Sequence, residues 1–212
     1  MKADNSVLLT TDRTWKIGDT AVVQYPATPE LLDILASVPF TVLPGRIVEE
    51  EPLQEFLVGA LQEGIDPGKV FDQDTLDKAT KPVAGEKWKL CKESAGVFDL
   101  TTLVGGQNNI LAHACVYLYS NSARKTQFWV GSDDGIQIVV NGKAVHTNPA
   151  TRGFEQDQDK IKDVELSKGW NTVLLGISQG VGGWAFGLRI RNETGDAAPT
   201  GLTYSAELLV EK

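Results

Sequence analysis

The sequence is poor in the side chains that carry out most nucleophilic and redox chemistry. Its 212 residues include only two cysteines and two histidines. Cys91 and Cys115 have no CxxC spacing, so neither a zinc site nor a disulfide framework is indicated. We expect two half-buried thiols, with one cross-strand disulfide as the alternative. His113 and His146 lack a Ser or Cys neighbour in a recognisable catalytic context, so acyl transfer is not expected.

Long apolar runs and runs of basic residues are also absent. No segment approaches the roughly 20 apolar residues that a membrane helix needs, so membrane insertion is not expected. The net charge is −8 and no basic stripe occurs, which argues against a nucleic-acid partner. Neither a phosphate-binding loop nor a dinucleotide fingerprint is present. Residues 1–10 do not have the apolar stretch of a signal peptide.

What the sequence does contain favours an all-β fold. Hydrophobic residues make up 42% and charged residues 23%, which is enough for a globular core. Residues 110–120 are apolar at successive positions, as in a central strand buried on both faces. Asn141-Gly142 predicts a tight hairpin. With turn residues between them, the further predicted strands indicate an antiparallel β-sandwich or jelly roll, and they cover 88–91, 126–131, 136–140, 143–147, 161–166, 171–178 and 184–190.

A helical insertion is predicted over residues 28–64. Thr28-Pro29-Glu30 has the pattern of a helix start. A second helix is expected after Pro52 and before Gly64, because apolar residues recur there at helical spacing, namely Leu53, Phe56, Leu57, Ala60 and Leu61. The insertion is too short to bury its own core. We therefore expect one domain over 1–212, with a first strand near Trp15 and its best-defined part over 85–191.

Acidic residues form the first candidate site. Asp133 and Asp134 are adjacent in a predicted turn, and Asp157 and Asp159 lie in a later loop. Calcium prefers several oxygen ligands, so Asp133 and Asp134 are candidate calcium ligands. The alternative is a hairpin turn in which the aspartates bind nearby N–H groups. A small glycan-active enzyme also stays open, because two carboxyl groups suffice for glycoside hydrolysis.

Tryptophans near strand ends form the second candidate site, since flat aromatic rings stack on sugars. In its strand Trp129 shares a face with Gln127 and not with Phe128, so it is expected to be exposed. Trp184 shares its face with apolar residues, which favours the core, but it is kept as a candidate. Arg152 lies in a loop followed by acids and is expected to contact a ligand or to form a structural ion pair.

Several short elements together resemble a known group of domains. They are Gly131-Ser-Asp-Asp-Gly135, Asn141-Gly-Lys-x-Val145, Arg152-Gly153, Asp157-Gln-Asp-Lys160 and Gly169-Trp-Asn171, with Trp15-Lys-Ile-Gly18 near the start. This set resembles the β-sandwich accessory domains of bacterial surface and secreted proteins, which are often appended to carbohydrate-active enzymes. The likeness covers 85–191 well and 14–25 faintly, and 26–80 departs from it.

The Ser-Asp-Asp-Gly element also resembles that of protective-antigen-type lectin domains, in which paired aspartates bind calcium and help to hold a sugar. This likeness implies calcium at Asp133 and Asp134. We therefore expect a non-catalytic, carbohydrate-binding-module-like domain of an extracellular, cell-surface or periplasmic protein. Its predicted site is the loop end 131–135 with 147–160, and its ligand-binding residues are Trp129, Asp133, Asp134, Arg152, Asp157, Asp159 and Trp184. The alternative is a structural domain without a sugar ligand, which packs on a partner protein domain through 28–64.

Overall fold

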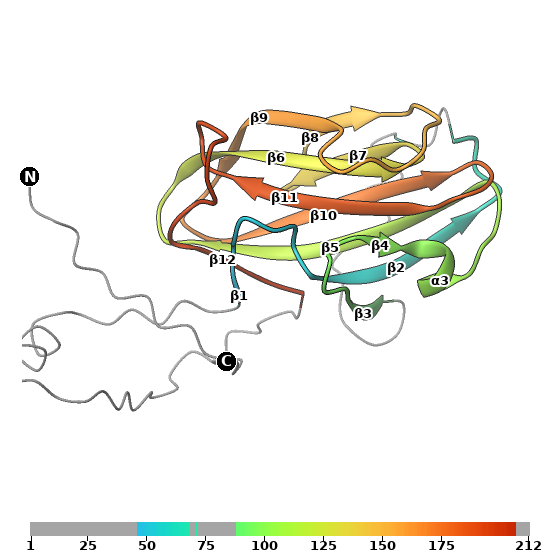
Figure 1. The fold of residues 1–212 in the computed structure, drawn as a ribbon, viewed down its shortest axis with the longest axis horizontal. Helices are drawn as coiled ribbons and strands as arrows, with labels where there is room; N and C mark the ends of the chain where they lie inside the picture. Colours follow the sequence, from blue (N-terminus) through green and yellow to red (C-terminus); the bar gives the residue numbers. More distant parts are fainter. Residues whose placement is uncertain (1–45, 68–70, 72–87, 207–212) are drawn as a thin grey trace, which may run out of the picture.

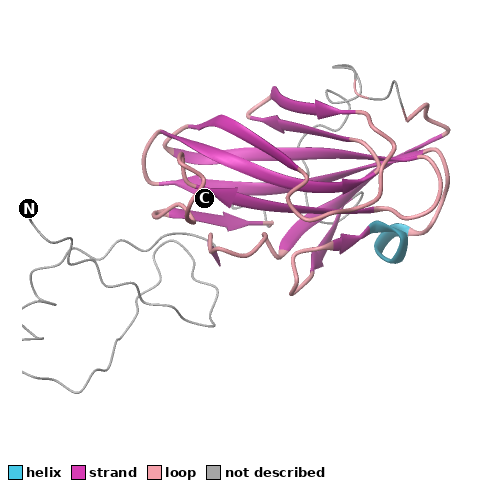
Figure 2. Cartoon of the chain, turned by 45° about the horizontal axis from the view of Figure 1, so that its top comes forward, coloured by secondary structure: helices cyan, strands magenta, loops and turns pink. Residues whose placement is uncertain are grey.

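The chain forms an antiparallel β-sandwich, as expected. The computed structural model describes residues 46–67, 71 and 88–206. Its two sheets pack face to face (Figures 1 and 2). Sheet A contains β1 (Arg46–Ile47), β2 (Glu55–Glu63), β3 (Trp88–Lys92), β5 (Ile110–Ser120), β7 (Ile136–Val140), β8 (Lys143–Asn148), β10 (Gly169–Gln179) and β12 (Leu202–Ser205). Sheet B contains β4 (Phe98–Asp99), β6 (Arg124–Asp133), β9 (Asp159–Leu166) and β11 (Ala185–Arg191).

Hydrogen bonds between neighbouring strands define the strand order of each sheet. In sheet A the order is β1-β12-β5-β10-β7-β8, and β2 pairs with β3 and with β5. In sheet B the order is β4-β11-β6-β9, so β6 lies between β9 and β11. A short helix, α3 (Leu100–Val104), follows β4, and the Asp99 carboxylate caps it by accepting the Thr102 amide at 3.3 Å. No helix within the described ranges is long and apolar enough to cross a membrane.

The main core lies between the sheets and is centred on three phenylalanines. The rings of Phe56, Phe98 and Phe186 lie 5.1 to 5.2 Å apart, centroid to centroid, and all three side chains are fully buried. A second cluster on the other face of sheet A includes Leu57 and Cys115. Sheet A is therefore apolar on both faces, which confirms the prediction for residues 110–120.

The predicted helix after Pro52 is wrong, because residues 55–63 form strand β2. Phe56 and Val58 belong to the main core, and Leu57 belongs to the cluster on the other face of sheet A. A strand buried on both faces needs a nearly continuous apolar run, and some members of such a run fall at helical spacing. β2 lies between β3 and β5, so both of its edges are hydrogen-bonded to other strands. Residues 28–45 and the strand expected near Trp15 lie outside the described residues.

The two cysteines are free and cannot pair. Cys91 is opposite Phe56 and Cys115 is opposite Leu57. Successive residues of a strand point to opposite faces, so the two thiols lie on opposite faces of sheet A. Burial raises the pKa of the Cys115 thiol to about 12, which keeps it protonated and unreactive. The disulfide alternative is therefore wrong.

Of the two turns predicted at 132–135 and at Asn141-Gly142, the structure confirms the second and corrects the first. Asn141 and Gly142 join β7 to β8 with φ values of 50° and 80°, as the predicted hairpin requires. The segment 132–135, in contrast, is not a hairpin turn. It ends β6 in sheet B and leads to β7 in sheet A, so it carries the chain from one sheet to the other.

Candidate functional site

The centre of the candidate site is Asp134, at the crossing between the two sheets. Its side chain is buried, with the residue 3% exposed, and the peptide bond before it is cis. One carboxylate oxygen accepts the Arg152 amide at 3.0 Å, and the other accepts the Gly180 amide at 2.7 Å. The Asp134 amide in turn donates to the Ser178 carbonyl at 3.0 Å. Asp134 therefore joins the end of β6 to the end of β10 and to the loop after β8.

Asp133 takes the opposite orientation and stays half-buried at the surface. Burial and the neighbouring charge of Asp134 raise the pKa of its carboxyl group, and a hydrogen bond from the Phe154 amide partly offsets this. Across residues 46–67, 71 and 88–206, no cationic side chain forms an ion pair with either aspartate. The pair thus places uncompensated negative charge where two loops meet.

The two carboxylates fit a cation by charge and by oxygen chemistry, but they do not surround one. The part of the chain that the structure describes has no cluster of three or more His, Cys, Asp or Glu side chains that could hold a metal ion. Asp134 already uses both oxygens to hold backbone amides. A calcium ion here would therefore take Asp133 as its main carboxylate ligand, and water or ligand oxygens would complete its coordination.

Arg152 and Asp159 form a structural ion pair, which was the alternative expectation for Arg152. The guanidinium donates to both oxygens of Asp159, at 2.9 and 2.8 Å, and also to the Ser132 hydroxyl at 2.7 Å. His146 Nε2 lies 2.9 Å from the same carboxylate, and Asn148 donates to it at 3.3 Å. A bidentate pair between a guanidinium and a carboxylate is stronger than a neutral hydrogen bond, and it fixes the geometry of both side chains.

The strength of this network appears in the acidity of Asp159. Burial alone would raise its pKa, but hydrogen bonds from Arg152, His146 and Asn148 outweigh burial and lower the pKa to about 2. Asp159 is opposite Val130 in the register of β6 and β9, and Val130 belongs to the main core. The Asp159 carboxylate therefore points inward and bridges β8 to β9 at the edge of the sandwich.

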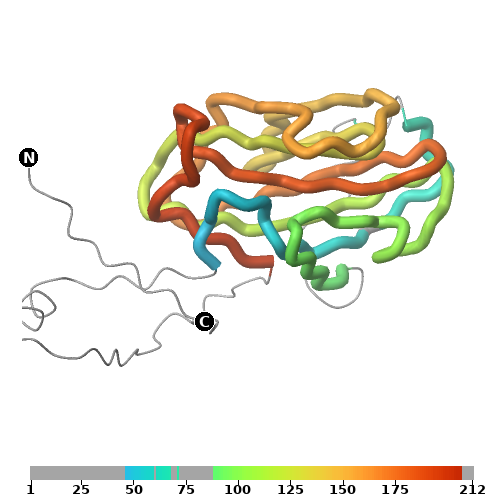
Figure 3. Tube along the Cα trace, viewed as in Figure 1, coloured from blue at the N-terminus to red at the C-terminus, as the bar shows by residue number. Residues whose placement is uncertain are grey.

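Two glycines leave room for the loop that carries Arg152. Gly131 and Gly187 are direct partners across β6 and β11, and Phe154 lies over both (the loop is gold in Figure 3). A Cβ atom at Gly131 would lie 2.1 Å from the Glu155 carbonyl oxygen. Glycine at this position therefore lets the loop 149–158 approach the backbone of sheet B closely.

Trp129 lies on the same outward face of β6 as Asp133, and its partial exposure agrees with the predicted face. Its indole N–H donates to Gln127 at 3.0 Å. Asp133 is four positions farther along the extended strand, about 13 Å from Trp129. Asp157 belongs to this part of the face, because it pairs at 3.6 Å with Arg189, the cross-strand neighbour of Trp129.

Trp184 is placed elsewhere, in the main core. The residue is 1% exposed, and its indole N–H donates to the Ile177 carbonyl at 3.3 Å. A ring with no exposed face cannot stack on a sugar, so Trp184 is removed from the candidate ligand-binding residues. The structure thus brings Asp133, Asp134, Arg152 and Asp159 together, places Trp129 and Asp157 farther along the outward face of sheet B, and buries Trp184.

Sequence reasoning missed the residues that build this end of the sandwich. Phe154, Gly180 and Gly183 contact the aspartates through backbone atoms or close approach, which no side-chain motif reveals. The glycines carried a signal, because Gly131 and Gly187 interrupt otherwise well-formed strands and such glycines often mark a close backbone approach. Only the strand register shows that they are partners.

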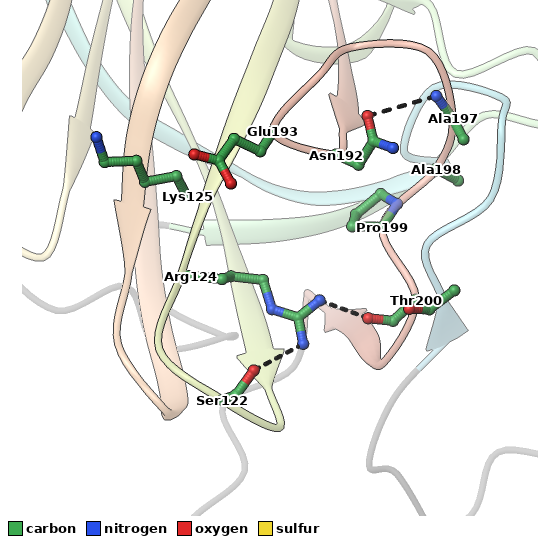
Figure 4. Close-up of a pocket in the computed structure, with 9 residues that line it drawn as sticks. All are labelled: Ser122, Arg124, Lys125, Asn192, Glu193, Ala197, Ala198, Pro199 and Thr200. Carbon is green, nitrogen blue, oxygen red and sulfur yellow. Dashed lines mark hydrogen bonds between the residues drawn. The ribbon is translucent and has the colours of Figure 1, made fainter. Parts of the chain in front are cut away.

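A separate hollow of about 340 Å³ lies at the other end of β6 (Figure 4). Arg124 extends into it, donates to the Thr200 carbonyl and donates to the Ser122 hydroxyl at 3.0 Å. Its guanidinium therefore holds two loops together. The hollow contains none of the predicted site residues, and it is lined by Ser122, Arg124, Lys125, Asn192, Glu193, Ala197, Ala198, Pro199 and Thr200.

Comparison with solved structures finds several distant matches. No family model and no curated protein matches the sequence. The PA14 domain of the MpAFP antifreeze protein is 14% identical with a TM-score of 0.41, and the match covers 82% of this chain and 98% of that one. The PA14 sugar-binding domain from an RTX adhesin is 22% identical with a TM-score of 0.36, over 74% and 72% of the two chains.

A family 35 carbohydrate-binding module from an environmental isolate is 17% identical with a TM-score of 0.37, over 74% of this chain and 96% of that one. Two further matched chains are longer, and this chain spans 50% and 19% of them. At these identities and TM-scores the likenesses do not identify a ligand. The function proposed below therefore rests on the side chains of this protein.

Replacing Gly131 by alanine tests the close approach of the loop. We expect Gly131→Ala to lower the free energy of unfolding by about 1–3 kcal/mol, because the added methyl group must displace the loop backbone. Gly153→Ala is the matched control in the same region, since a Cβ there has no atom within 4 Å. Urea unfolding of both variants measures the difference. Equal stability of the two variants would show that the loop does not pack on sheet B as described.

Asp159 predicts a specific pH dependence of stability. Its pKa is about 2 in the folded protein against an ordinary value of 3.8. A lowered folded-state pKa stabilises the fold above pH 3.8, and this contribution is lost as the pH falls through 2. Asp159→Asn removes the contribution, so the variant is less stable at neutral pH, by about 2 kcal/mol, and its stability falls less between pH 4 and 2. Unfolding curves at several pH values measure this, and parallel curves for the two proteins would contradict the assignment.

Proposed function

We propose that this protein is a non-catalytic carbohydrate-binding domain that binds sugar at the sandwich end containing Asp133. The observation that carries the proposal is the uncompensated carboxylate of Asp133, held at the surface beside a buried and fully hydrogen-bonded Asp134. A carboxylate with raised pKa and no cationic partner favours binding of a cation or of hydroxyl donors. Sugar hydroxyl groups supply donors and, around a calcium ion, oxygen ligands.

Calcium is part of the proposal. Asp133 is the principal ligand, and Asp134 contributes negative charge while its oxygens hold the loops. The loops 149–158 and 180–183 border the position, because the Phe154 amide binds Asp133 and a Cβ at Gly183 would lie 2.5 Å from an Asp133 oxygen. Sugar hydroxyls complete the coordination of the ion.

A non-catalytic role is supported by the state of the acids at this end. Glycoside hydrolysis needs two carboxyl groups that reach the scissile bond, one of them with a raised pKa. Asp134 is buried and its oxygens bind amides, and Asp159 is ionised and bound to Arg152. Of the four candidate aspartates, Asp133 alone has no ion pair with a described residue and does not have both oxygens bound to amides. The setting that follows from a polysaccharide ligand is an extracellular, cell-surface or periplasmic protein.

Thermal unfolding with and without calcium tests the site. We expect calcium to raise the melting temperature of the wild-type protein, with a stabilisation of about 2.7 kcal/mol when its concentration is a hundred times the dissociation constant. Asp133→Asn should abolish this shift while leaving the fold intact, because its carboxylate forms no ion pair within the described residues. Asp163→Asn is the control, since Asp163 is an exposed acid that pairs with Lys125 far along the sheet.

Affinity electrophoresis through gels that contain polysaccharides then tests the function. Stronger retardation in calcium than in EDTA, with the difference lost in Asp133→Asn, supports the proposal. Retardation that neither EDTA nor Asp133→Asn changes would contradict a calcium-dependent sugar site at Asp133.

A further inference from the structure

A second feature of the outward face of sheet B concerns Trp129 and the cations around it. Trp129 is in β6, and its direct neighbours are Lys160 in β9 and Arg189 in β11. The Lys160 ammonium lies 4.2 Å from the centroid of the indole ring, and the Arg191 guanidinium lies 5.1 Å from it. Both distances allow a cation–π interaction. The half-exposed ring therefore contacts cations from the strands on either side of it.

The two cations differ in how firmly they are held. Arg191 is buried and its guanidinium forms an ion pair with Glu50, so it is part of the fixed surroundings of the ring. Lys160 is exposed, and it forms no ion pair with any residue in the described ranges. A long exposed lysine side chain can leave the ring at small cost, because an exposed cation–π contact is weak.

Two exposed lysines of β9, Lys160 and Lys162, form no ion pair with a described residue, and of these two Lys160 is the one that contacts the Trp129 ring. Lys125 pairs with Asp163 at 3.1 Å, and Arg189 pairs with Asp157 at 3.6 Å. Arg191 in turn is bound to Glu50, so each of these three cations has an acidic partner. Lys160 thus carries a positive charge without an ion pair to any described residue, and it lies beside a partly exposed aromatic ring on a protein whose net charge is −8.

We infer that Trp129 and Lys160 form a subsite for an acidic pyranose, a uronate residue of an anionic polysaccharide. The sugar ring stacks on the indole, and the sugar carboxylate pairs with the Lys160 ammonium, which moves off the ring to meet it. A neutral sugar would have to displace Lys160 without gaining that ion pair. The inference rests on the proposed carbohydrate-binding function and gives it a ligand class and a second point of contact, about 13 Å from Asp133.

Affinity electrophoresis with matched ligands tests the subsite. Polygalacturonate is compared with its carboxyl-reduced, neutral form, in EDTA so that calcium does not contribute. We expect Trp129→Ala to weaken binding to polygalacturonate about tenfold and Trp129→Phe to weaken it less, because a ring is retained. Lys160→Gln should weaken the same binding about two- to fivefold, the size of an exposed ion pair, and should leave binding to the neutral polymer unchanged or tighter.

Lys162→Gln is the matched control, because Lys162 is an exposed lysine of the same strand and its loss changes the net charge equally. It should bind polygalacturonate as the wild-type protein does. Equal weakening by Lys160→Gln and Lys162→Gln, or equal binding of a single-stranded DNA oligonucleotide, would show general polyanion attraction and overturn the inference. Binding of the neutral polymer as tight as that of the acidic one would also overturn it.

The same gels separate this inference from the proposed function. Retardation in calcium that is lost in Asp133→Asn but unaffected by Trp129→Ala and Lys160→Gln keeps the Asp133 site and overturns the subsite. Retardation in calcium that depends on Trp129 and Lys160 but not on Asp133, and that is equal in EDTA, keeps the subsite and overturns the Asp133 site.

Discussion

The buried carboxylate of Asp134 is the constraint on which this end of the molecule depends. An ionised carboxylate inside a protein is costly unless hydrogen bonds replace its water. Here the amides of Arg152 and Gly180 supply them, so the loops 149–158 and 180–183 must both come to the end of β6. Their arrival leaves Asp133 at the surface between them. The position of the proposed site therefore follows from satisfying one buried charge.

The alternation of β6 separates structural from functional residues. Phe128, Val130 and Ser132 point between the sheets, where the first two form core and the third accepts a hydrogen bond from Arg152. Trp129 and Asp133 point outward, and Gly131 between them lets the loop 149–158 pack closely on the strand. Four acids of similar appearance in the sequence thus have different roles. Asp134 and Asp159 bind neighbouring loops and strands, Asp157 pairs with Arg189, and Asp133 has no ion pair with a described residue and is the proposed ligand-binding acid.

The strands after residue 85 could be predicted because their signals are local. Alternation along 126–131 placed Trp129 outward, and Asn141-Gly142 fixed a hairpin through positive φ at both residues. β2 was predicted as a helix because, unlike residues 110–120, its apolar residues also fall at helical spacing between Pro52 and Gly64. The helix expected at Thr28 and the strand expected near Trp15 lie outside the described residues.

The site itself was only partly predictable, for a different reason. The sequence pointed to two loops, 131–135 and 147–160, since acids and turn residues gather there, and the structure brings these loops into contact through Asp134 and Arg152. It could not show that Arg152 pairs with Asp159, or that its amide binds Asp134, because both contacts depend on how the two sheets are placed. Trp184 was included because a tryptophan near a strand end has the same local pattern whether it is buried or exposed.

The most direct test of the account is to follow backbone amides by NMR while calcium and then a bound polysaccharide fragment are added. The amides of Arg152, Phe154 and Gly180 donate to the two carboxylates, so they report on any ligand that arrives there. The account predicts that these three amides shift first and saturate with calcium, and shift again with the sugar. Shifts spread evenly over the acidic surface, or confined to other parts of the sandwich, would contradict a sugar site at Asp133.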